Sequence, residues 1–413
     1  MIYLSTTLNN ANITSPSGTK TSDFIHESVM EIEDEKRSII FQHPPSSMQF
    51  HVKIFQGAEL RFGIGIDPLA WEKTYGVVFI VEAKAEKTQS LFSKLLNPRF
   101  NADDRRWKDF KIPLDQFANK EIDLIFRTDM GAWRIADFCW AGWSNPRIVW
   151  PREISPLIRD ILACPVCRSD VEVEKDNVIC SKCDRRYPVL WGVPIMFPDN
   201  DEISEGRLEL SRNTYTTLAE TIIKKSKLVL NCGAGYPPTA YPNVVELDLS
   251  PLPSTHICGT GESLPFKDEV FDGFISRAVI EHVKNPFAYA NEAYRVLKKG
   301  GEIFVDSAFL QPLHAYPNHY FNTTRDGLEL LFSAFKKTQS GVADYQHPKV
   351  ALKWFLETYL EGLEEGDKGA IMEMTIKEVL KNLSEKNSTP LDRLRQRFQE
   401  KIACGVFFSG IKN

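Results

Sequence analysis

The sequence feature that most constrains the fold of this chain is a pair of C-x-x-C motifs. Cys164 and Cys167 form the first motif and Cys180 and Cys183 the second, with twelve residues, 168–179, between them. Two such knuckles on adjacent hairpins can bring four sulfurs into the tetrahedron that Zn²⁺ prefers. We therefore predict a small module with a closed, structural zinc site that these four cysteines form. A redox-active pair or chance spacing is the alternative interpretation.

The other cysteines and the overall charge add further expectations. Cys139, Cys232, Cys258 and Cys404 are scattered among apolar neighbours, so we expect them to pack as small hydrophobic residues. The net charge of −5 argues against binding nucleic acid through bulk charge. No apolar run is long enough for a membrane span, and residues 1–15 do not have the pattern of a signal peptide. We expect a cytoplasmic protein.

The pattern along the 413 residues predicts a multidomain protein. Residues 1–36 are rich in Ser, Thr and Asn, then acidic, and we expect them to be partly disordered. Residues 37–152 contain short alternating runs with turn residues between them, which is typical of an all-β sandwich. Residues 153–200 hold the zinc ribbon. Strand-like and helix-like segments alternate in 201–345, which predicts an α/β, Rossmann-like domain, and 346–413 form a helical C-terminal extension.

Individual elements follow from the same patterns. The predicted sandwich strands include 48–55, 59–66, 77–83, 108–112 and 122–128. The predicted α/β strands are 227–231, 244–248, 271–276 and 302–305, with a helix over 285–297 before the last one. Two lysines and two glycines, 298–301, follow this helix, and late positive charge followed by glycine predicts its end.

A glycine-containing loop follows the first strand of the α/β segment. Gly233 and Gly235 lie in Leu-Val-Leu-Asn-Cys-Gly-Ala-Gly-Tyr, where glycine permits a tight turn and close approach of the backbone to a ligand. Asp248 ends the next strand, where a carboxylate can accept hydrogen bonds from both ribose hydroxyls. A dinucleotide site usually has a third glycine. This loop instead continues Tyr-Pro-Pro, so the sequence does not favour a dehydrogenase.

Five segments in this order resemble class I S-adenosylmethionine-dependent methyltransferases. They are Val-Leu-Asn-Cys-Gly-Ala-Gly, Glu-Leu-Asp-Leu-Ser, residues 259–266, residues 271–282, and Arg-Val-Leu-Lys-Lys-Gly-Gly. The resemblance implies S-adenosylmethionine as the cofactor. Gly233 and Gly235 would face its methionine part and Asp248 its ribose. Thr260 and Glu262, in the turn 259–262, would lie against its adenine.

Two positions depart from the pattern of that family. Asn231 stands where an acid is common, and Thr260 stands where the adenine-side turn commonly has an aspartate. Asn231 can still bind the ammonium group of the cofactor through its side-chain oxygen, without charge assistance. A non-catalytic binding or scaffold protein with a degenerate methyltransferase fold is therefore the alternative to an enzyme.

The catalytic candidates lie beyond the last predicted strand. His314, His319 and Tyr320 belong to residues 309–324, after the carboxyl end of a strand, where α/β sites form. A base there could accept the proton of the methyl acceptor. A closely similar segment occurs in methyltransferase-domain proteins of bacterial surface-glycan loci. The alternative is a hydrogen-bonded structural loop, and we interpret His282 as structural.

Two more resemblances concern the modules in front. Residues 162–196, with Cys-Ser-Lys-Cys-Asp-Arg-Arg-Tyr-Pro-Val-Leu-Trp-Gly, resemble a zinc-ribbon family whose members activate tRNA and protein methyltransferases as a separate subunit. Segments 61–71, 105–109 and 136–147 resemble a carbohydrate-binding-type β-sandwich. Their tryptophans can stack on sugar rings or fill the core, and their polar residues can bind calcium or satisfy loop backbone. These residues are Trp71, Trp107, Trp140 and Trp143, with Asp67, Asp137 and Asn145.

The three modules together predict a function. We expect S-adenosylmethionine-dependent methyl transfer to a glycan or glycolipid intermediate of surface polysaccharide. The alternatives are the scaffold named above and a tRNA or protein methyltransferase, against which the acidic charge balance and the sandwich argue. The expected partner is a glycan or another small-molecule acceptor rather than nucleic acid. The sequence predicts no oligomeric state.

Overall fold

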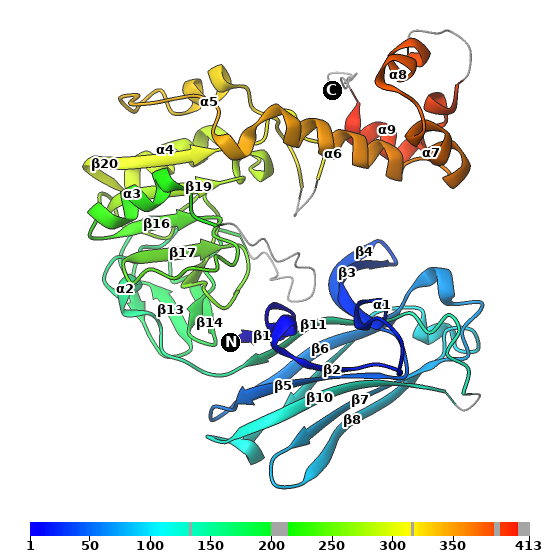
Figure 1. Cartoon of the computed structure of the whole chain (residues 1–413). Helices are drawn as coiled ribbons and strands as arrows, with labels where there is room; N and C mark the ends of the chain where they lie inside the picture. Colours follow the sequence, from blue (N-terminus) through cyan, green and yellow to red (C-terminus); the bar gives the residue numbers. More distant parts are fainter. Residues whose placement is uncertain (132–133, 200–213, 315–317, 384–388, 404–413) are drawn as a thin grey trace, which may run out of the picture. The chain divides into compact units, whose positions relative to one another are not determined.

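The computed structural model describes residues 1–131, 134–199, 214–314, 318–383 and 389–403 (Figure 1). The chain divides into two compact units. The first comprises Met1–Ile275 and Val296–Ile303, and the second comprises Ser276–Arg295 and Phe304–Asn413. Cys404 lies outside the described residues, whereas Cys139, Cys232 and Cys258 are buried, as predicted.

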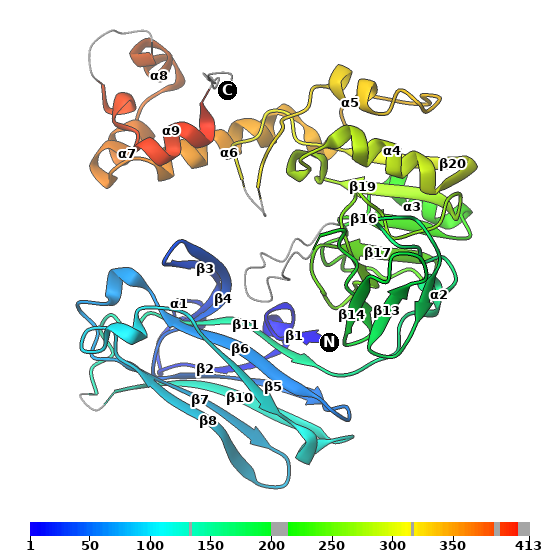
Figure 2. The same ribbon diagram turned by 180° about the vertical axis from the view of Figure 1, so that it is seen from behind.

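The N-terminal part of the first unit is a sandwich of two antiparallel sheets (Figure 2). The first sheet has the order β3-β4-β11-β6-β9, with β1 also paired to β11, and the second has the order β2-β5-β10-β7-β8. The strands are β1 Ile2–Tyr3, β2 Asn12–Thr14, β3 Ile25–Ile32, β4 Glu35–Gln42, β5 Ser46–Lys53, β6 Glu59–Ile66, β7 Val77–Lys84, β8 Thr88–Leu96, β9 Lys108–Pro113, β10 Glu121–Met130 and β11 Ala141–Val149. This confirms the predicted sandwich.

Aromatic side chains fill the space between the two sheets. Trp143 is fully buried at the centre, and its ring makes edge contacts with Phe62, Phe79 and Phe126 at centroid distances of 5.3, 5.0 and 4.9 Å. The indole Nε1 donates a 2.6 Å hydrogen bond to Oε1 of the buried Gln42, so its one polar group is satisfied. Trp143 is therefore a core residue of the sandwich and not a platform for sugar.

The first 36 residues differ from the expectation of a partly disordered segment. They supply β1, β2 and β3 to the two sheets, and Leu4 is fully buried. β3 pairs with β4 from Ile25↔Gln42 to Ile32↔Glu35 through a tight turn in which Glu33 and Asp34 have positive φ angles of 51° and 62°. Glu-Asp is not a common sequence for this turn, for which Asn-Gly is the usual signal. The strands β1 and β2 are only two and three residues long, and they pair with strands that lie farther along the chain. The sequence of residues 1–36 therefore shows no local pattern that would predict them.

The middle part of the first unit is a small four-stranded sheet in the order β12-β13-β14-β15. Its strands are Val171–Val173, Asn177–Cys180, Arg186–Leu190 and Val193–Pro194, and the short helix α2, Pro156–Arg159, precedes them. Leu162 bridges to Phe266 and Ile195 to Cys258, so backbone bonds join this module to the α/β segment that follows it.

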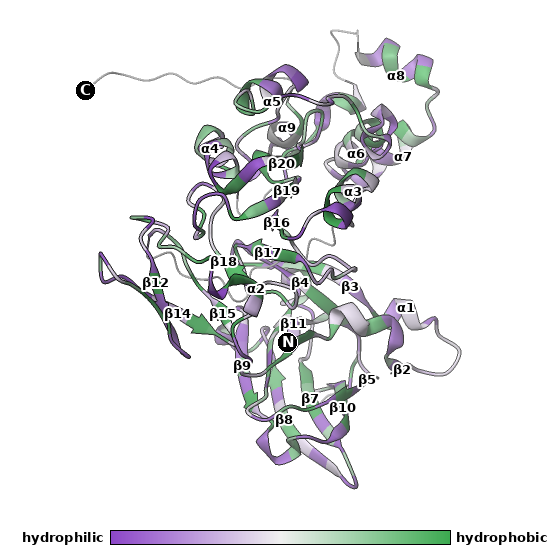
Figure 3. Cartoon of the chain, turned by 90° about the vertical axis from the view of Figure 1, so that its left-hand side faces the viewer, coloured by the Kyte–Doolittle hydropathy of each residue, from purple (hydrophilic) through white to green (hydrophobic). Residues whose placement is uncertain are grey.

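The α/β segment has a five-stranded sheet in the order β18-β17-β16-β19-β20. Its strands are β16 Val229–Cys232, β17 Val244–Asp248, β18 Ile257–Cys258, β19 Phe271–Arg277 and β20 Leu297–Asp306. The first four are parallel, and β16 and β17 are mainly hydrophobic (Figure 3), as expected for strands covered on both faces. This confirms the predicted α/β fold.

One boundary of this segment differs from the prediction. The helix α4 spans Pro286–Val296, as expected, but residues 298–301 belong to β20 and not to a loop. Gly300 has a φ of +80°, a conformation that glycine adopts without strain. Gly300 and Gly301 therefore lie within the first half of β20, and they do not only mark the end of α4.

The C-terminal extension is helical, as predicted. The helix α5, Arg325–Leu331, precedes the extension, whose described helices are α6 Pro348–Glu361, α7 Glu365–Met372, α8 Ile376–Leu383 and α9 Gln396–Ile402. The side chains of Leu363, Leu394 and Phe398 form a small core between them. Among the described residues, no helix combines the length and the apolar character that crossing a membrane requires.

Candidate functional site

The four cysteines of the two C-x-x-C motifs lie together in the first unit. The Sγ atoms of Cys164 and Cys183 are 3.7 Å apart, those of Cys167 and Cys180 3.4 Å, and those of Cys167 and Cys183 3.7 Å. A disulfide needs about 2.05 Å, whereas sulfurs bound tetrahedrally to zinc at ~2.3 Å lie about 3.8 Å apart. The cluster therefore fits one zinc ion.

Backbone groups support this cluster in the way a thiolate site requires. The amides of Lys182 and Cys183 both donate to Sγ of Cys180 at 3.4 Å. The residues after the two knuckles, Arg168 and Asp184, have positive φ angles of 59° and 56°, which turn the chain around the cluster. Such N–H donors offset the negative charge that four thiolates leave on Zn²⁺. Four thiolates would complete a tetrahedral coordination without an open position, as expected for a structural site.

The predicted cofactor loop and the acidic strand end come together. Gly233 and Gly235 follow β16 with φ angles of 74° and 60°, and the amide of Gly235 donates a 2.8 Å hydrogen bond to Oδ2 of Asp248, at the end of β17. The amide of Ser250 donates to Oδ1 of the same carboxylate at 3.2 Å. Burial raises the pKa of Asp248, and these amides counteract it. Each carboxylate oxygen keeps a further lone pair for a ribose hydroxyl.

Asn231 has neighbours that the sequence did not reveal. Its Nδ2 donates to Oε2 of Glu246 at 2.8 Å and to the hydroxyl of Tyr215 at 3.1 Å. Tyr215 in turn donates to Oε1 of Glu246 at 2.6 Å. Glu246 is 3% exposed, and burial raises its pKa from 4.5 to about 7. The acid that the family pattern has at position 231 is absent, but an acidic residue of the next strand lies beside it.

The raised pKa of Glu246 predicts a pH-dependent stability. Between about pH 4.5 and 7 the folded chain keeps a proton that the unfolded chain releases, so the free energy of unfolding falls as pH rises through this window. Glu246→Gln should remove this slope and raise stability at pH 8 by up to about 3.5 kcal/mol, because the pKa rises from 4.5 to about 7 and each pKa unit corresponds to ~1.4 kcal/mol. Calorimetric melting at pH 5 and pH 8 measures both effects.

A matched control for this experiment is available on α3, Thr217–Lys225. Glu220 is half-buried there and its pKa is lowered by Lys224, so between pH 5 and pH 8 it is largely ionised in both states. Glu220→Gln should therefore leave the slope unchanged. A Glu246→Gln protein with the wild-type slope would contradict the assignment.

The turn predicted to face adenine lies against the zinc module. The amide of Met196 donates to the carbonyl of Cys258 at 2.8 Å, and the hydroxyl of Ser263 donates to the carbonyl of Pro165 at 2.5 Å. Thr260 and Glu262 lie between these two anchors and are half-buried. The cysteine module thus contacts both ends of the turn.

The catalytic candidates lie in the second unit. The His314 ring is 4.6 Å from that of His319 and 5.2 Å from that of His282, all edge to face. The amide of Tyr320 donates to the carbonyl of Glu281 at 2.6 Å, and the Tyr320 side chain is 38% exposed. The two candidate histidines therefore meet His282, which we interpreted as structural. Sequence reasoning did not identify Glu281, although it directly precedes His282.

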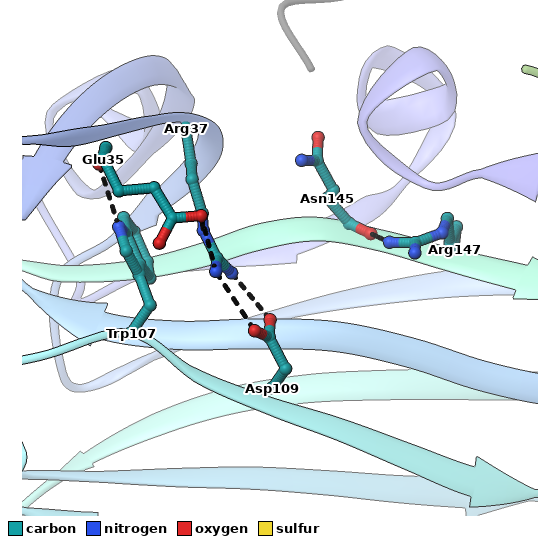
Figure 4. A network of polar contacts seen from close by, with 6 residues as sticks. All are labelled: Glu35, Arg37, Trp107, Asp109, Asn145 and Arg147. Atoms are coloured by element: carbon teal, nitrogen blue, oxygen red, sulfur yellow. Dashed lines mark hydrogen bonds and ion pairs between the residues drawn. The ribbon is translucent and has the colours of Figure 1, made fainter. Parts of the chain in front are cut away.

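The sandwich has a polar network on its first sheet (Figure 4). Arg37 of β4 binds Asp109 of β9 through two hydrogen bonds of 2.6 and 3.1 Å, and its guanidinium lies 5.0 Å from the ring centre of Trp107. Trp107 is 8% exposed and donates to the carbonyl of Glu35. The ring of Trp107 stacks against Arg37, and the polar groups of both side chains have hydrogen-bond partners within the protein. This favours a structural role for Trp107.

The neighbouring strand β11 carries a bulge between Ser144 and Arg147. Asn145 has a φ of 42° there, and Arg147 donates to its carbonyl at 3.1 Å (Figure 4). Asn145 also borders a depression of about 260 Å³. Its polar lining comprises Ser5, Glu27, Ser28, Ser38 and Asn145.

The remaining polar and aromatic candidates of the sandwich have local roles. Asp67 accepts a 2.9 Å hydrogen bond from the amide of Leu69 and caps a short turn. Trp71 donates to the carbonyl of Ile66, and Trp140 packs against the core. Asp137 is exposed. Within the described ranges, none of these side chains belongs to a group of His, Cys, Asp or Glu that could hold a metal ion.

Comparison with known proteins assigns two of the modules. Residues 228–305 match the family model described as a methyltransferase domain. This part of the chain is a methyltransferase domain. Residues 155–190 match the family described as Trm112p-like protein, so a Trm112p-like module precedes the methyltransferase domain. The matches bear out both resemblances for these parts of the chain.

Individual relatives cover only parts of the chain. An uncharacterized protein of Archaeoglobus fulgidus is 35% identical over 133 residues, which is 30% of this chain and 34% of that protein. The chloroplastic 2-methyl-6-phytyl-1,4-hydroquinone methyltransferase 2 of Oryza sativa is 30% identical over 115 residues, 26% of this chain and 31% of that protein. The chain thus spans about a third of the length of these relatives.

Carbohydrate-binding modules are among the solved structures to which part of this chain is similar. A CBM51 domain from Clostridium perfringens GH95, solved in complex with methyl-galactose, covers 36% of this chain and 99% of that domain. The sequence identity is 14% and the TM-score 0.27. A likeness at this level says nothing about ligands of the present chain.

Proposed function

We propose that this protein transfers a methyl group from S-adenosylmethionine to a saccharide-bearing acceptor. The observation that carries the first half is the arrangement around Asp248. The glycine loop with Gly233 and Gly235 and the carboxylate of Asp248 follow adjacent strands of the methyltransferase domain and are joined by a hydrogen bond. Ligands of α/β sheets bind beyond the carboxyl ends of the strands.

The residues present suit this cofactor. Asp248 would accept hydrogen bonds from the ribose hydroxyls, and the glycine loop would admit the methionine part, since neither glycine has a side chain to exclude it. Thr260 and Glu262 would lie against the adenine. S-adenosylmethionine supplies an activated methyl group, so the protein mainly needs to align donor and acceptor and to accept a proton. His314, His319 and Tyr320 are our candidates for the latter task.

The acceptor class rests on the sandwich and on charge. The depression beside Asn145 is lined by three serines, a glutamate and the buried Asn145, residue types whose polar groups can pair with sugar hydroxyls. Its volume of about 260 Å³ is close to the lower end of the usual range for ligand sites, ~300–1,000 Å³. The net charge of −5 disfavours a polyanion such as tRNA. We place the acceptor among glycan or glycolipid intermediates of surface polysaccharide.

Transfer of labelled methyl groups tests this proposal. The full chain is incubated with methyl-labelled S-adenosylmethionine and, separately, with oligosaccharides and glycolipids, with tRNA, and with protein. We expect label in the saccharide fraction and none with the Asp248→Ala protein. Label in tRNA or protein instead would overturn the acceptor class and would favour the alternative that the Trm112p-like module suggests.

A specific observation favours a second candidate, a non-catalytic binding or scaffold protein. Both hydrogens of the Asn231 amide are used within the protein, on Glu246 and Tyr215, and the carboxylate of Asp248 is bonded to the loop that would receive the cofactor. These bonds leave the Asn231 oxygen and further lone pairs of Asp248 for a ligand, so this candidate rests on the missing acid at position 231, without which the ammonium group of the cofactor would be held by an uncharged acceptor. Absence of binding at millimolar cofactor would favour this candidate over an enzyme.

A further inference from the structure

Besides the four cysteines, the described part of the chain contains one more group of side chains that could hold a metal ion. It consists of Glu281, His282 and His314, whose donor atoms all lie within 4.8 Å of one another. Glu281 and His282 belong to the short turn Ile280–His282 that follows β19, and His314 follows β20. All three residues lie within the second compact unit.

The carboxylate of Glu281 lacks the partners that a buried charge needs. The residue is fully buried, and its Oε1 has no hydrogen-bond partner. Its Oε2 has a long contact of 3.4 Å from the hydroxyl of Ser307, and the amide of Glu281 itself also interacts with the carboxylate. Burying a carboxylate without compensation is costly, and buried charges are usually paired or coordinate metals. A cation held by this cluster would provide that compensation.

The two histidines have the hydrogen bonds that metal-binding histidines make. Nδ1 of His282 lies 2.7 Å from the carbonyl of Asn318, and Nδ1 of His314 lies 3.0 Å from the carbonyl of Pro312. Because a carbonyl only accepts, each Nδ1 carries the proton and each Nε2 keeps its lone pair. A backbone carbonyl that orients the ring from the opposite nitrogen is the usual support of a metal ligand.

His319 has a different role in the cluster. Its Nδ1 contacts the carbonyl of His314 at 3.1 Å, and its Nε2 contacts Oδ1 of Asn322 at 3.0 Å. Both ring nitrogens are therefore engaged with the protein. His319 holds the backbone at His314 in place and is a positioning residue rather than a ligand.

We propose that Glu281, His282 and His314 bind one divalent first-row transition metal ion such as Zn²⁺. His314 would then be a ligand and could not accept a proton, so of the candidates for that task His319 and Tyr320 would remain. Two imidazoles and a carboxylate suit such ions, and three protein ligands leave a position open for water, as in catalytic rather than structural zinc sites. Donors at ~2.0–2.1 Å from one ion lie about 3–4 Å apart. The side chains therefore need to close by about 1 Å on binding, which rotation of the imidazoles can supply.

Titration of the metal-free full chain with Co²⁺ tests the proposal, because cobalt spectra separate the two kinds of site. We expect two equivalents per chain. One should show the intense thiolate-to-cobalt band of the cysteine cluster, and the other only the weak bands of nitrogen and oxygen ligands. Glu281→Gln and His314→Ala should each lose the second equivalent and keep the thiolate band. Circular dichroism confirms that both variants are folded.

His347 offers a matched control in the same unit. It caps α6 by accepting a hydrogen bond from the amide of Lys349 at 3.2 Å. His347→Asn removes an imidazole and keeps a capping oxygen, so it should bind both equivalents. Co²⁺ should also raise the melting temperature of the wild type and of this control by more than that of Glu281→Gln.

Two outcomes would overturn the metal site. One is a single equivalent of Co²⁺ bound by the wild type, all of it with the thiolate band. The other is a second equivalent that persists in both Glu281→Gln and His314→Ala. Neither measurement requires methyl transfer, so failure of the proposed activity does not affect the result.

Discussion

Replacing Cys164 by Ser is expected to abolish zinc binding and to unfold the Trm112p-like module. Cys164 is fully buried, and its Sγ lies within 4.8 Å of the other three sulfurs of the cluster. Structural zinc sites of this kind contribute apparent binding free energies of roughly 10–16 kcal/mol, far more than the short strands β12–β15 can replace. Elemental analysis should show one zinc fewer per chain than in the wild type, and melting should show the loss of one transition.

The same variant should weaken binding of S-adenosylmethionine without abolishing it. The module contacts the two ends of the segment 258–263 through Met196 and Pro165, but none of its residues is a proposed cofactor ligand. We expect a loss of about tenfold in affinity, equivalent to ~1.4 kcal/mol. Isothermal titration measures it.

Cys139→Ser is the control for the zinc experiment. Cys139 is equally buried but lies in the sandwich, where its thiol contacts Thr74. Its replacement should leave the zinc content and the cofactor affinity unchanged, whatever it costs the sandwich. A zinc-free wild-type protein that melts like the zinc-loaded one would show that the cysteines are not a structural metal site.

Asp248→Ala is expected to reduce the affinity for S-adenosylmethionine by about 100-fold or more. Each hydrogen bond to a charged group contributes roughly 1.5–3 kcal/mol, and this carboxylate would accept two from the ribose. The variant also removes the partner of the Gly235 amide, so the loop loses the bond that holds it to β17. Isothermal titration of the full chain with the cofactor gives the affinity directly.

Glu269→Gln is the matched control for Asp248→Ala. Glu269 is an exposed acid of the same unit, in the turn before β19, and should not change affinity. An Asp248→Ala protein whose affinity lies within about threefold of the wild type, less than ~1 kcal/mol, would contradict the role of Asp248. Wild-type protein that does not bind the cofactor at all would instead favour the scaffold.

The regular elements of this chain could be predicted because their signals are local. The strands β6 and β7 show runs that alternate or are continuously apolar between turn residues, and burial then follows the pleat. The two C-x-x-C motifs could be predicted for the same reason, because each motif spans only four residues and its spacing places the two sulfurs near each other. The methyltransferase segments are recognisable for the same reason.

The first 36 residues show where local signals end. The two-residue strand β1 has no pattern of its own, and its place beside β11 depends on Ile148 and Arg147, almost 150 residues away. Leu4 is buried only because the strands of the sandwich form a hydrophobic core around it. A segment that looks too polar to fold is therefore ordered by partners that lie far along the chain.

Sequence alone specifies the modules, their order and the chemical types available in them, because periodicity and short motifs are read within a few residues. The neighbours of individual acids depend on the tertiary structure. Glu246 and Glu281 look like ordinary surface acids in the sequence, yet both are buried. One is paired with Asn231 and Tyr215, and the other lies beside two histidines that come from separate segments. Burial and pairing are set by contacts across the fold. These contacts raise the pKa of Glu246 and leave Oε1 of Glu281 buried without a hydrogen-bond partner.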